Sequence, residues 1–209
     1  MNTTRLTYFL LIFTFISIGL PAQESEIELN TGFGSTTVDE YNMKFVLPYR
    51  NDTEYANFFR FGINYYYSPN NAIFNLKTGL DYDLKWKNEI KLNYFKSPIG
   101  IDFKIGKKVQ FILGGGLFLS YLISYTGTSN NTDFEETKNR FQIGWYANTG
   151  IGFQISEKYN LSIKYQYSAD ITKMYDYHRT SPGGSPYKLD TKSYDGFFIL
   201  CLKYKLKKE

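Results

Sequence analysis

The sequence has little of the chemistry on which metal sites and disulfides depend. It contains one cysteine, Cys201, one histidine, His178, and two tryptophans. A single cysteine can form no intramolecular disulfide and no site of several thiolates. The formal net charge is only +4, and the basic residues are spread along the chain, whereas binding to phosphate backbones needs them gathered on one face. We therefore expect no cofactor, no metal ion and no nucleic-acid partner.

Long apolar runs are also scarce, and the longest stands at the start of the sequence. Arg5, an apolar stretch over residues 6–20 and the small residue Ala22 follow one another as in a secretory signal peptide. The stretch is shorter than the roughly 20 residues of a membrane-spanning helix. No cysteine follows it directly, which argues against a lipid-anchored lipoprotein. The sequence predicts a signal peptide at residues 1–22, with the exact cleavage position open, and one exported domain at residues 23–209.

Alternation of apolar and polar residues dominates the rest of the chain. In residues 160–172 the apolar side chains Leu161, Ile163 and Tyr165 begin a series at odd positions, with polar side chains between them. This period of two is the pattern of a strand with lipid on one face, and the 20 Tyr and 18 Phe suit strands. Eight segments share it: residues 26–36, 58–67, 72–86, 90–105, 109–125, 141–155, 160–172 and 194–206.

The connections between these segments alternate in length. Short turns are expected at residues 68–71, 106–108 and 156–158, and longer or more polar loops at residues 37–57, 85–89, 126–139 and 173–193. Outer-membrane barrels have short periplasmic turns and longer extracellular loops. The sequence therefore predicts an all-β fold, an eight-stranded antiparallel up-and-down transmembrane β-barrel in the cell outer membrane, with both chain ends on the periplasmic side.

Four short patterns resemble the outer-membrane β-barrel domain family described as PorT-like. They are the leader end Pro21-Ala22-Gln23, the opening strand with Asn30-Thr31-Gly32-Phe33-Gly34, the mid-chain Pro98 and the run Gly114-Gly115-Gly116. The resemblance covers most of the mature chain and implies an exported eight-stranded barrel, with some relatives linked to protein export or surface functions. One departure is the C-terminus, which runs from Tyr204 to Glu209 instead of ending on an aromatic residue.

The polar face of the segments carries charges of both signs. An eight-stranded barrel is only wide enough inside to be filled by side chains, so we expect a paired polar core without an open channel. Cys201 falls on the same face and is expected to be an inert small residue. The expected lumen set is Glu28, Arg60, Lys77, Asp81, Asp83, Lys91, Asp102, Lys104, Lys164, Asp170, Asp195 and Lys203.

Three local features have structural interpretations. Between Leu92 and Phe103 the apolar face moves from even to odd positions across Pro98, which predicts a β-bulge. The glycine run is expected inside a strand, because no helix follows it to form a phosphate-binding turn. Eight aromatic residues could stack on sugars, but several of them lie near strand ends, where we expect girdles at the membrane interfaces: Trp86, Trp145, Tyr65, Tyr67, Tyr82, Tyr94, Tyr121 and Tyr125.

No group of residues forms a recognisable active site. His178 lies near Asp176 and Ser181, but closeness in a loop does not establish the geometry of a nucleophile and its base. Asp133, Glu135 and Glu136 lack the ligand spacing of a calcium loop. We therefore predict no catalytic, cofactor-binding or metal-binding residues.

Three functions remain open at this stage. The first is a non-enzymatic scaffold in contact with outer-membrane lipids, which meets an extracellular or periplasmic protein through residues 37–57 and 173–193. The second is an outer-membrane enzyme that modifies lipids such as lipid A. The third is a secreted lipocalin-like barrel, which would turn its apolar face inward around a ligand. The mixed charges of the polar face favour an apolar face that points outward to lipid.

Overall fold

The computed structural model describes residues 24–42, 54–69, 73–87, 90–126, 135–138, 140–172, 175–180 and 186–206. The predicted signal peptide, residues 1–22, lies outside these ranges. Within them, no helix has the length and apolar character that crossing a membrane would require. All the regular elements of this part of the chain are β-strands.

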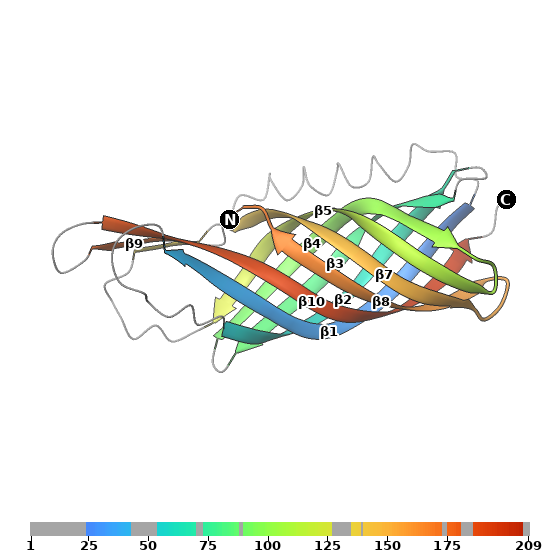
Figure 1. Ribbon diagram of the computed structural model, residues 1–209, viewed down its shortest axis with the longest axis horizontal. Helices are drawn as coiled ribbons and strands as arrows, with labels where there is room; N and C mark the ends of the chain where they lie inside the picture. Colours follow the sequence, from blue (N-terminus) through green and yellow to red (C-terminus); the bar gives the residue numbers. More distant parts are fainter. Residues whose placement is uncertain are drawn as a thin grey trace.

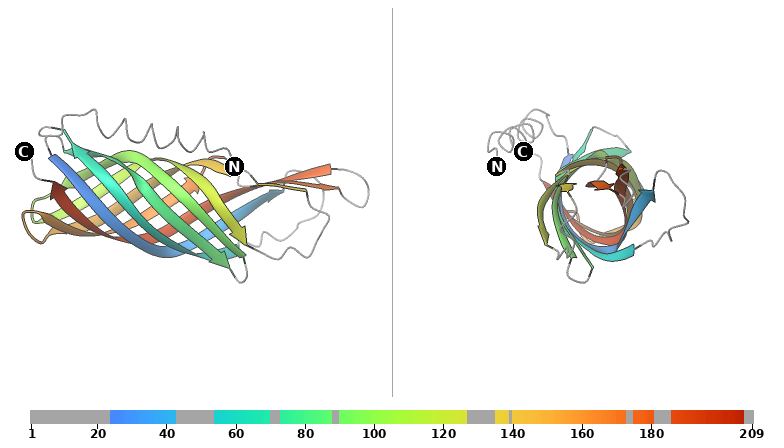
Figure 2. Two further views of the ribbon diagram at one scale, coloured as in Figure 1. Left: turned by 180° about the vertical axis from the view of Figure 1, so that it is seen from behind. Right: turned by 90° about the vertical axis from the view of Figure 1, so that its left-hand side faces the viewer.

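Eight long strands close into an antiparallel up-and-down barrel, as predicted (Figures 1 and 2). They are β1 (Glu24–Asn42), β2 (Glu54–Ser68), β3 (Phe74–Lys87), β4 (Ile90–Ile105), β5 (Val109–Thr126), β7 (Phe141–Gln154), β8 (Tyr159–Asp170) and β10 (Pro186–Leu206). Each strand pairs with its neighbour in that order, and β1 pairs with β10 to close the ring. Closure leaves no unpaired sheet edge within the barrel, as the axial view in Figure 2 shows.

The strands run further than the sequence predicted at the rim that carries the long connections. β1 and β10 stay paired as far as Asn42 and Leu189, and two short strands, β9 (Tyr175–Thr180) and β6 (Glu135–Lys138), continue the sheet from β10. We call residues 39–42, 135–138, 175–180 and 186–193 the strand extension. In Figure 1, β9 and the first part of β10 project from the barrel at the end opposite the C-terminus.

The predicted loops at residues 37–57, 126–139 and 173–193 are therefore partly strand. Backbone pairing satisfies the N–H and C=O groups of polar segments as well as apolar ones, so alternation of apolar residues underestimates the strand length. The expected loop at residues 85–89 is shorter than predicted, because β3 extends to Lys87 and β4 begins at Ile90.

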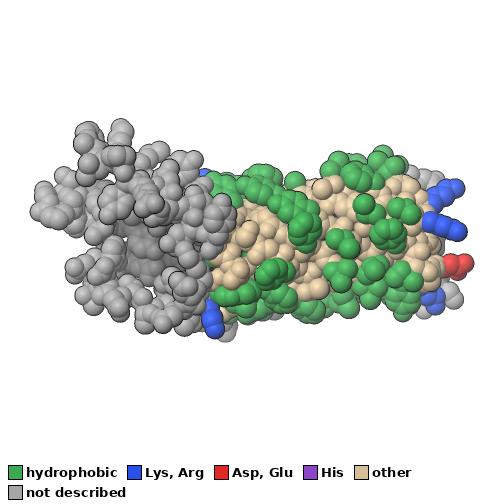
Figure 3. Space-filling model, turned by 60° about the horizontal axis from the view of Figure 1, so that its bottom comes forward, with side chains coloured by type: hydrophobic (Ala, Val, Ile, Leu, Met, Phe, Trp, Pro, Cys, Tyr) green, Lys and Arg blue, Asp and Glu red, His purple; other side chains and the backbone are tan. Residues whose placement is uncertain are grey.

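Side chains alternate between the two faces of the wall, with charged groups inside and apolar groups outside. Along β7, buried and exposed positions alternate with a period of two over most of the strand. Phe33, Ile163 and Phe198 on the outer wall are 59%, 54% and 63% exposed, and Figure 3 shows hydrophobic side chains over the outside of the barrel. A bilayer buries such a surface. The lipocalin-like alternative is therefore wrong, since it requires the apolar face to point inward.

The predicted bulge at Pro98 is wrong. Even positions of β4 face the lumen throughout, so that Leu92 and Tyr94 are buried inside the barrel. The ladder between β3 and β4 is interrupted at Pro98, which has no N–H to donate, but the register on either side is unchanged. The register shift lies instead at Asn93 and Tyr94, opposite β5. The shift of apolar residues from even to odd positions suggested a bulge because apolar side chains occupy some lumen positions as well as the outer wall.

The glycine run lies within strand β5, as predicted. Gly114 faces the lumen opposite Asp102, and a Cβ atom at Gly114 would overlap the carboxylate of Asp102. Similarly, a Cβ atom at Gly100 would overlap the hydroxyl of Tyr146. The glycines therefore provide space inside the barrel for the large polar side chains of neighbouring strands.

Most of the predicted girdle residues lie on the outer wall. Trp145 packs with Tyr167 at a ring-centroid distance of 5.7 Å, and Tyr82 packs with Phe95 at 6.0 Å. Tyr94 is the exception, because its side chain is 2% exposed and faces the lumen. The side chain of Tyr125 lies outside the described residues. The girdle residues with described outward positions are Trp86, Trp145, Tyr65, Tyr67, Tyr82 and Tyr121.

Candidate functional site: the charged lumen

The structure places most of the predicted lumen set inside the barrel. Ten of the twelve residues are buried: Glu28, Arg60, Lys77, Asp81, Asp83, Asp102, Lys164, Asp170, Asp195 and Lys203. Lys104 is half-buried and binds Glu26. Lys91 is exposed, which corrects its assignment to the lumen. As an odd position of β4, Lys91 shares the outward face with Phe95 and Ile101.

Within the described part of the chain, three buried charged residues are absent from the predicted lumen set: Glu26, Lys85 and Lys96. A signal for each was present, because each shares its parity with a predicted lumen residue of the same strand: Glu26 with Glu28 on β1, Lys85 with Asp83 on β3, and Lys96 with Asp102 on β4. The alternation of residues 72–86 places Lys85 on the polar face, but residue 85 also belongs to the expected loop at residues 85–89 and is not included in the predicted lumen set.

An upper cluster of charges lies on the side of the long connections and is centred on Arg60 of β2. Its Nε and Nη2 atoms donate to the two carboxylate oxygens of Asp83 on β3 at 2.6 and 2.7 Å. Its Nη1 atom lies 3.5 Å from Asp81. The guanidinium carbon lies 5.5 Å from the ring centre of Phe58 and 4.5 Å from that of Phe197. Arg60 is therefore held both by a two-pronged ion pair and by two aromatic rings.

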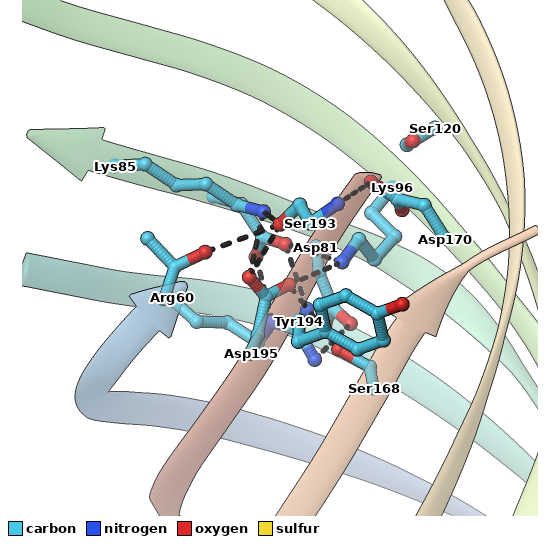
Figure 4. A network of polar contacts seen from close by, with 12 residues as sticks. Arg60, Asp81, Lys85, Lys96, Ser120, Ser168, Asp170, Ser193, Tyr194 and Asp195 are labelled. Carbon is cyan, nitrogen blue, oxygen red and sulfur yellow. Dashed lines mark hydrogen bonds and ion pairs between the residues drawn. The ribbon is translucent and has the colours of Figure 1, made fainter. Parts of the chain in front are cut away.

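Asp195 of β10 is the second centre of the upper cluster (Figure 4). Lys85 donates to it at 2.7 Å, and Lys96 lies 3.5 Å from its other carboxylate oxygen. Lys96 also pairs with Asp83 at 3.0 Å, so that one lysine joins the two carboxylates. The hydroxyls of Ser168 and Ser193 donate to Asp195 at 3.2 and 2.9 Å. Strands β2, β3, β4, β8 and β10 are thereby connected across the lumen.

A lower cluster lies on the side of the short turns and is centred on Lys164 of β8. Its Nζ atom is 3.0 Å from Glu28, 3.2 Å from Asp102 and 3.1 Å from the hydroxyl of Tyr66. Lys203 lies 3.3 Å from Glu28 and 3.3 Å from the ring centre of Tyr66. Nearer the rim, Lys104 donates to Glu26 at 2.6 Å. These contacts connect β1, β2, β4, β8 and β10.

The buried charges nearly cancel. Among the side chains that the structure describes, seven carboxylates and six basic groups are buried: Glu26, Glu28, Asp81, Asp83, Asp102, Asp170 and Asp195, with Arg60, Lys77, Lys85, Lys96, Lys164 and Lys203. The half-buried Lys104 completes the balance. Because an unpaired buried charge is costly, such a balance is what a closed interior requires. The lumen of the described chain is thus a filled, salt-bridged core.

The arrangement offers little for catalysis. Ser193 lies 2.6 Å from the Nζ atom of Lys85, a pair that resembles a nucleophile with a lysine base. Lys85 also donates to Asp195 at 2.7 Å, and an ammonium that donates to a carboxylate has no lone pair with which to accept the proton of Ser193. Among the described residues, no three His, Cys, Asp or Glu side chains are grouped so as to hold a metal ion.

The residues that the sequence singled out for chemistry lie apart from the lumen. Asp176 and His178 are two positions apart in β9, and Glu135 and Glu136 belong to β6. The backbone register places His178 opposite Glu135 and Lys188. The side chains of these residues, together with Ser181 and Asp133, lie outside the described part of the structure.

The filled lumen predicts that the protein does not conduct ions. The ion pairs of both clusters cross the lumen. Because the buried charges are paired with one another, they do not need a continuous column of water through the barrel to solvate them. Reconstituted into planar bilayers, the protein should show no steady large conductance. A stable pore under these conditions would contradict the closed core.

Comparisons with known proteins find similar folds among solved structures, but no matching family model and no matching curated protein. Among solved structures, Neisserial surface protein A is 16% identical with a TM-score of 0.50, and the match covers 86% of this chain and 97% of that chain. Ail, the attachment invasion locus protein of Yersinia pestis, is 16% identical with a TM-score of 0.42, and covers 88% and 100%. The outer membrane enzyme PagL is 8% identical with a TM-score of 0.49, and covers 87% and 99%.

At sequence identities this low, the structural similarity supports a shared fold and nothing about function. The fold that the chain shares with Neisserial surface protein A is a closed eight-stranded antiparallel barrel. Its outer wall is apolar and its interior is charged and paired, as a bilayer-spanning barrel requires. The chain has the architecture and the surface of an outer-membrane β-barrel protein, which agrees with the localisation predicted from the sequence.

Proposed function

We propose that this protein is a non-enzymatic outer-membrane scaffold that presents its strand extension to a protein partner outside the cell. The observation that carries the proposal is the projection of the sheet beyond the barrel rim. β10 is 21 residues long, and only the part from Tyr194 onward pairs with β8. Before that point β10 pairs with β1 and β9, so the extension is a continuation of the barrel wall.

The sequence of the extension is suited to protein contacts. In the register of β9 and β10, Tyr177 stands opposite Leu189 and Arg179 opposite Tyr187. Because alternate positions share a face of a sheet, these four positions fall on one face. Tyrosine and arginine are enriched where proteins bind one another. A rigid frame that holds such positions away from the membrane supports a role in binding.

We also propose that the chain is a PorT-like barrel and that residues 1–22 are removed as a signal peptide. The likeness to PorT-like barrels rests on the sequence patterns described above, and removal of residues 1–22 as a signal peptide rests on their composition. A lipid-modifying activity built on His178 would require this residue to meet its partners at the lipid-facing rim. Unchanged lipid A processing by a His178→Ala variant would contradict a lipid-modifying activity that depends on His178.

Removal of the extension provides the test of function. A variant in which residues 174–190 are replaced by a short Gly-Ser linker should still form the barrel, because β8 and β10 remain paired from Ala169↔Tyr194 to Tyr159↔Tyr204. It should run faster on gels when unheated than after boiling, as we also expect of the full chain. In a strain that lacks the protein, however, the variant should fail to restore the surface property that is lost with the protein and regained with the full chain.

The control is the folded state of the truncated barrel in the same cells. If the variant folds and restores the surface property fully, the extension is not the functional part and the proposal is wrong. If the variant folds and restores nothing, the function resides in the extension.

A further inference from the structure

A groove of about 430 Å³ lies on the outer wall of the barrel and has no part in the lumen or the extension. It crosses three neighbouring strands and is lined by Ser35 and Thr37 of β1, Tyr165 and Tyr167 of β8, and Tyr194 and Gly196 of β10. All six positions lie on the outward face, because the residues next to them along each strand, such as Thr36, Gln166 and Asp195, are buried in the lumen. The groove therefore opens toward the bilayer.

The depth of the groove comes from small residues between large ones. The ladder places Gly196 between Ser35 and Tyr167, so that the middle strand has no outward side chain at this point. Tyr165 leans over the gap, since a Cβ atom at Gly196 would lie 2.7 Å from its hydroxyl oxygen. Tyr165 is also fixed by Phe198, at a ring-centroid distance of 5.2 Å. Backbone forms the floor of the groove and tyrosine rings form one side.

The groove lies at the upper edge of the apolar band. Below it, the outer wall is lined by Phe33, Ile163 and Phe198. Tyr159 and Tyr204 pack together at the other end of these strands, at a ring-centroid distance of 5.3 Å. From Tyr159 to Tyr167 is eight residues of strand, which at ~3.3 Å per residue and a tilt of ~40° is a height of roughly 20 Å. The apolar band of such barrels is ~25 Å tall, so the groove lies where acyl chains meet headgroups.

The lining has the chemistry of that boundary. It combines tyrosine rings, which offer apolar faces, with the hydroxyls of Ser35 and Tyr165, which can donate hydrogen bonds to an ester. The hydroxyl of Thr37 donates to the backbone oxygen of Tyr194. None of the six lining residues carries a charge, so the groove has nothing with which to select a phosphate or an ammonium group. The complementary part of a lipid is the neutral ester region with the first carbons of its acyl chains.

We propose that this groove binds one ester-linked lipid of the outer leaflet, held by its ester region and the start of one acyl chain. This inference goes beyond the proposed function, because it concerns the membrane-facing wall and would hold for a barrel without its extension. The strand extension and the groove can therefore fail their tests independently.

The test fills the groove and measures lipid retention. Ser35→Phe places a ring in the groove at an exposed, lipid-facing position. Thr78→Phe makes the same change on the outward face of β3, away from the groove. The purified full-length proteins are titrated with dioleoylphosphatidylethanolamine in detergent, and bound lipid is counted by native mass spectrometry. The wild-type chain and Thr78→Phe should each retain one lipid, and Ser35→Phe should bind it at least tenfold more weakly.

A tryptophan reporter checks the result in a bilayer. Trp86→Phe leaves Trp145 as the single tryptophan, next to Tyr167 at the side of the groove. In vesicles of an ether-linked phosphatidylcholine with a small fraction of brominated ester-linked phosphatidylcholine, its fluorescence should be quenched beyond the bulk proportion, and Ser35→Phe should remove the excess. Equal lipid retention by Ser35→Phe and the wild-type chain, equal losses in both phenylalanine variants, or no retention by the wild-type chain would each overturn the proposal.

Discussion

Replacing Arg60 by methionine should lower the free energy of unfolding of the barrel by about 3–5 kcal/mol, the cost of breaking a buried ion pair by removing one partner. Arg60 is 2% exposed, and it donates twice to Asp83 and approaches Asp81. Methionine occupies a similar space but leaves both carboxylates with weaker partners. Urea unfolding of the protein in lipid vesicles, followed by tryptophan fluorescence, measures the change.

Two variants separate the ion pair from packing. Lys91→Met changes the same kind of charge on the exposed face of β4 and should cost less than about 0.5 kcal/mol, as surface substitutions usually do. Adding Asp83→Leu to Arg60→Met removes one of the two carboxylates that have lost Arg60 and should recover part of the loss, although Lys96 then keeps only Asp195. Equal stability of Arg60→Met and Lys91→Met would mean that the upper cluster does not stabilise the barrel.

Replacing Gly116 by alanine should have an equally large effect, at or above the ~3 kcal/mol reached by severe overpacking. Gly116 faces the lumen opposite Gly100 of β4. A Cβ atom there would overlap the carbonyl oxygen of Ile99 and the Cα atom of Gly100. Both obstacles belong to the backbone of a strand that is paired on two sides, so neither can move aside cheaply. We expect most of the protein to lose the faster-migrating folded band on unheated gels.

The adjacent Gly115→Ala is the matched control. Gly115 points to the outer face of the same strand, where the nearest atom to an added Cβ atom is the backbone oxygen of Tyr146 at 3.0 Å. The change in chain entropy and in composition is the same for the two variants. Folding that is equally impaired, or equally intact, in both would show that crowding inside the barrel is not what requires glycine at residue 116.

The barrel could be predicted from the sequence because its outer face is chemically uniform. Wherever an apolar side chain pointed outward, as at Ile163 or Phe103, the period of two gave the correct face. The prediction failed where the inner face is apolar as well, at Leu92 and Tyr94, because polarity then no longer distinguishes the two faces. Lys91 was misplaced for the same reason. The extended ends of β1 and β10 were missed since their pairing depends on backbone hydrogen bonds, which leave no polarity pattern.

The ion pairs themselves could not be predicted. Parity places Lys164, Glu28 and Asp102 in the lumen, but which lysine meets which carboxylate depends on the stagger of β8 against β1 and β4. That stagger is fixed by closure of the ring, in which Lys203 stands opposite Glu28 and Lys164 opposite Ile199. A one-residue change in register would exchange the two faces of a strand. The positions of the charges follow from the sequence, and their partners follow from the closed ring.

The unbroken pairing of β1 with β10 also determines how the molecule would respond to force. The ladder runs from Ser25↔Leu206 at the turn side to Asn42↔Leu189 in the strand extension. Its hydrogen bonds lie perpendicular to the strands, so a pull on the extension along the strand axis loads all of them at once in shear instead of opening them one by one. Tension on a bound partner would thus be shared along the full height of the wall, and the barrel would serve as a mechanical anchor.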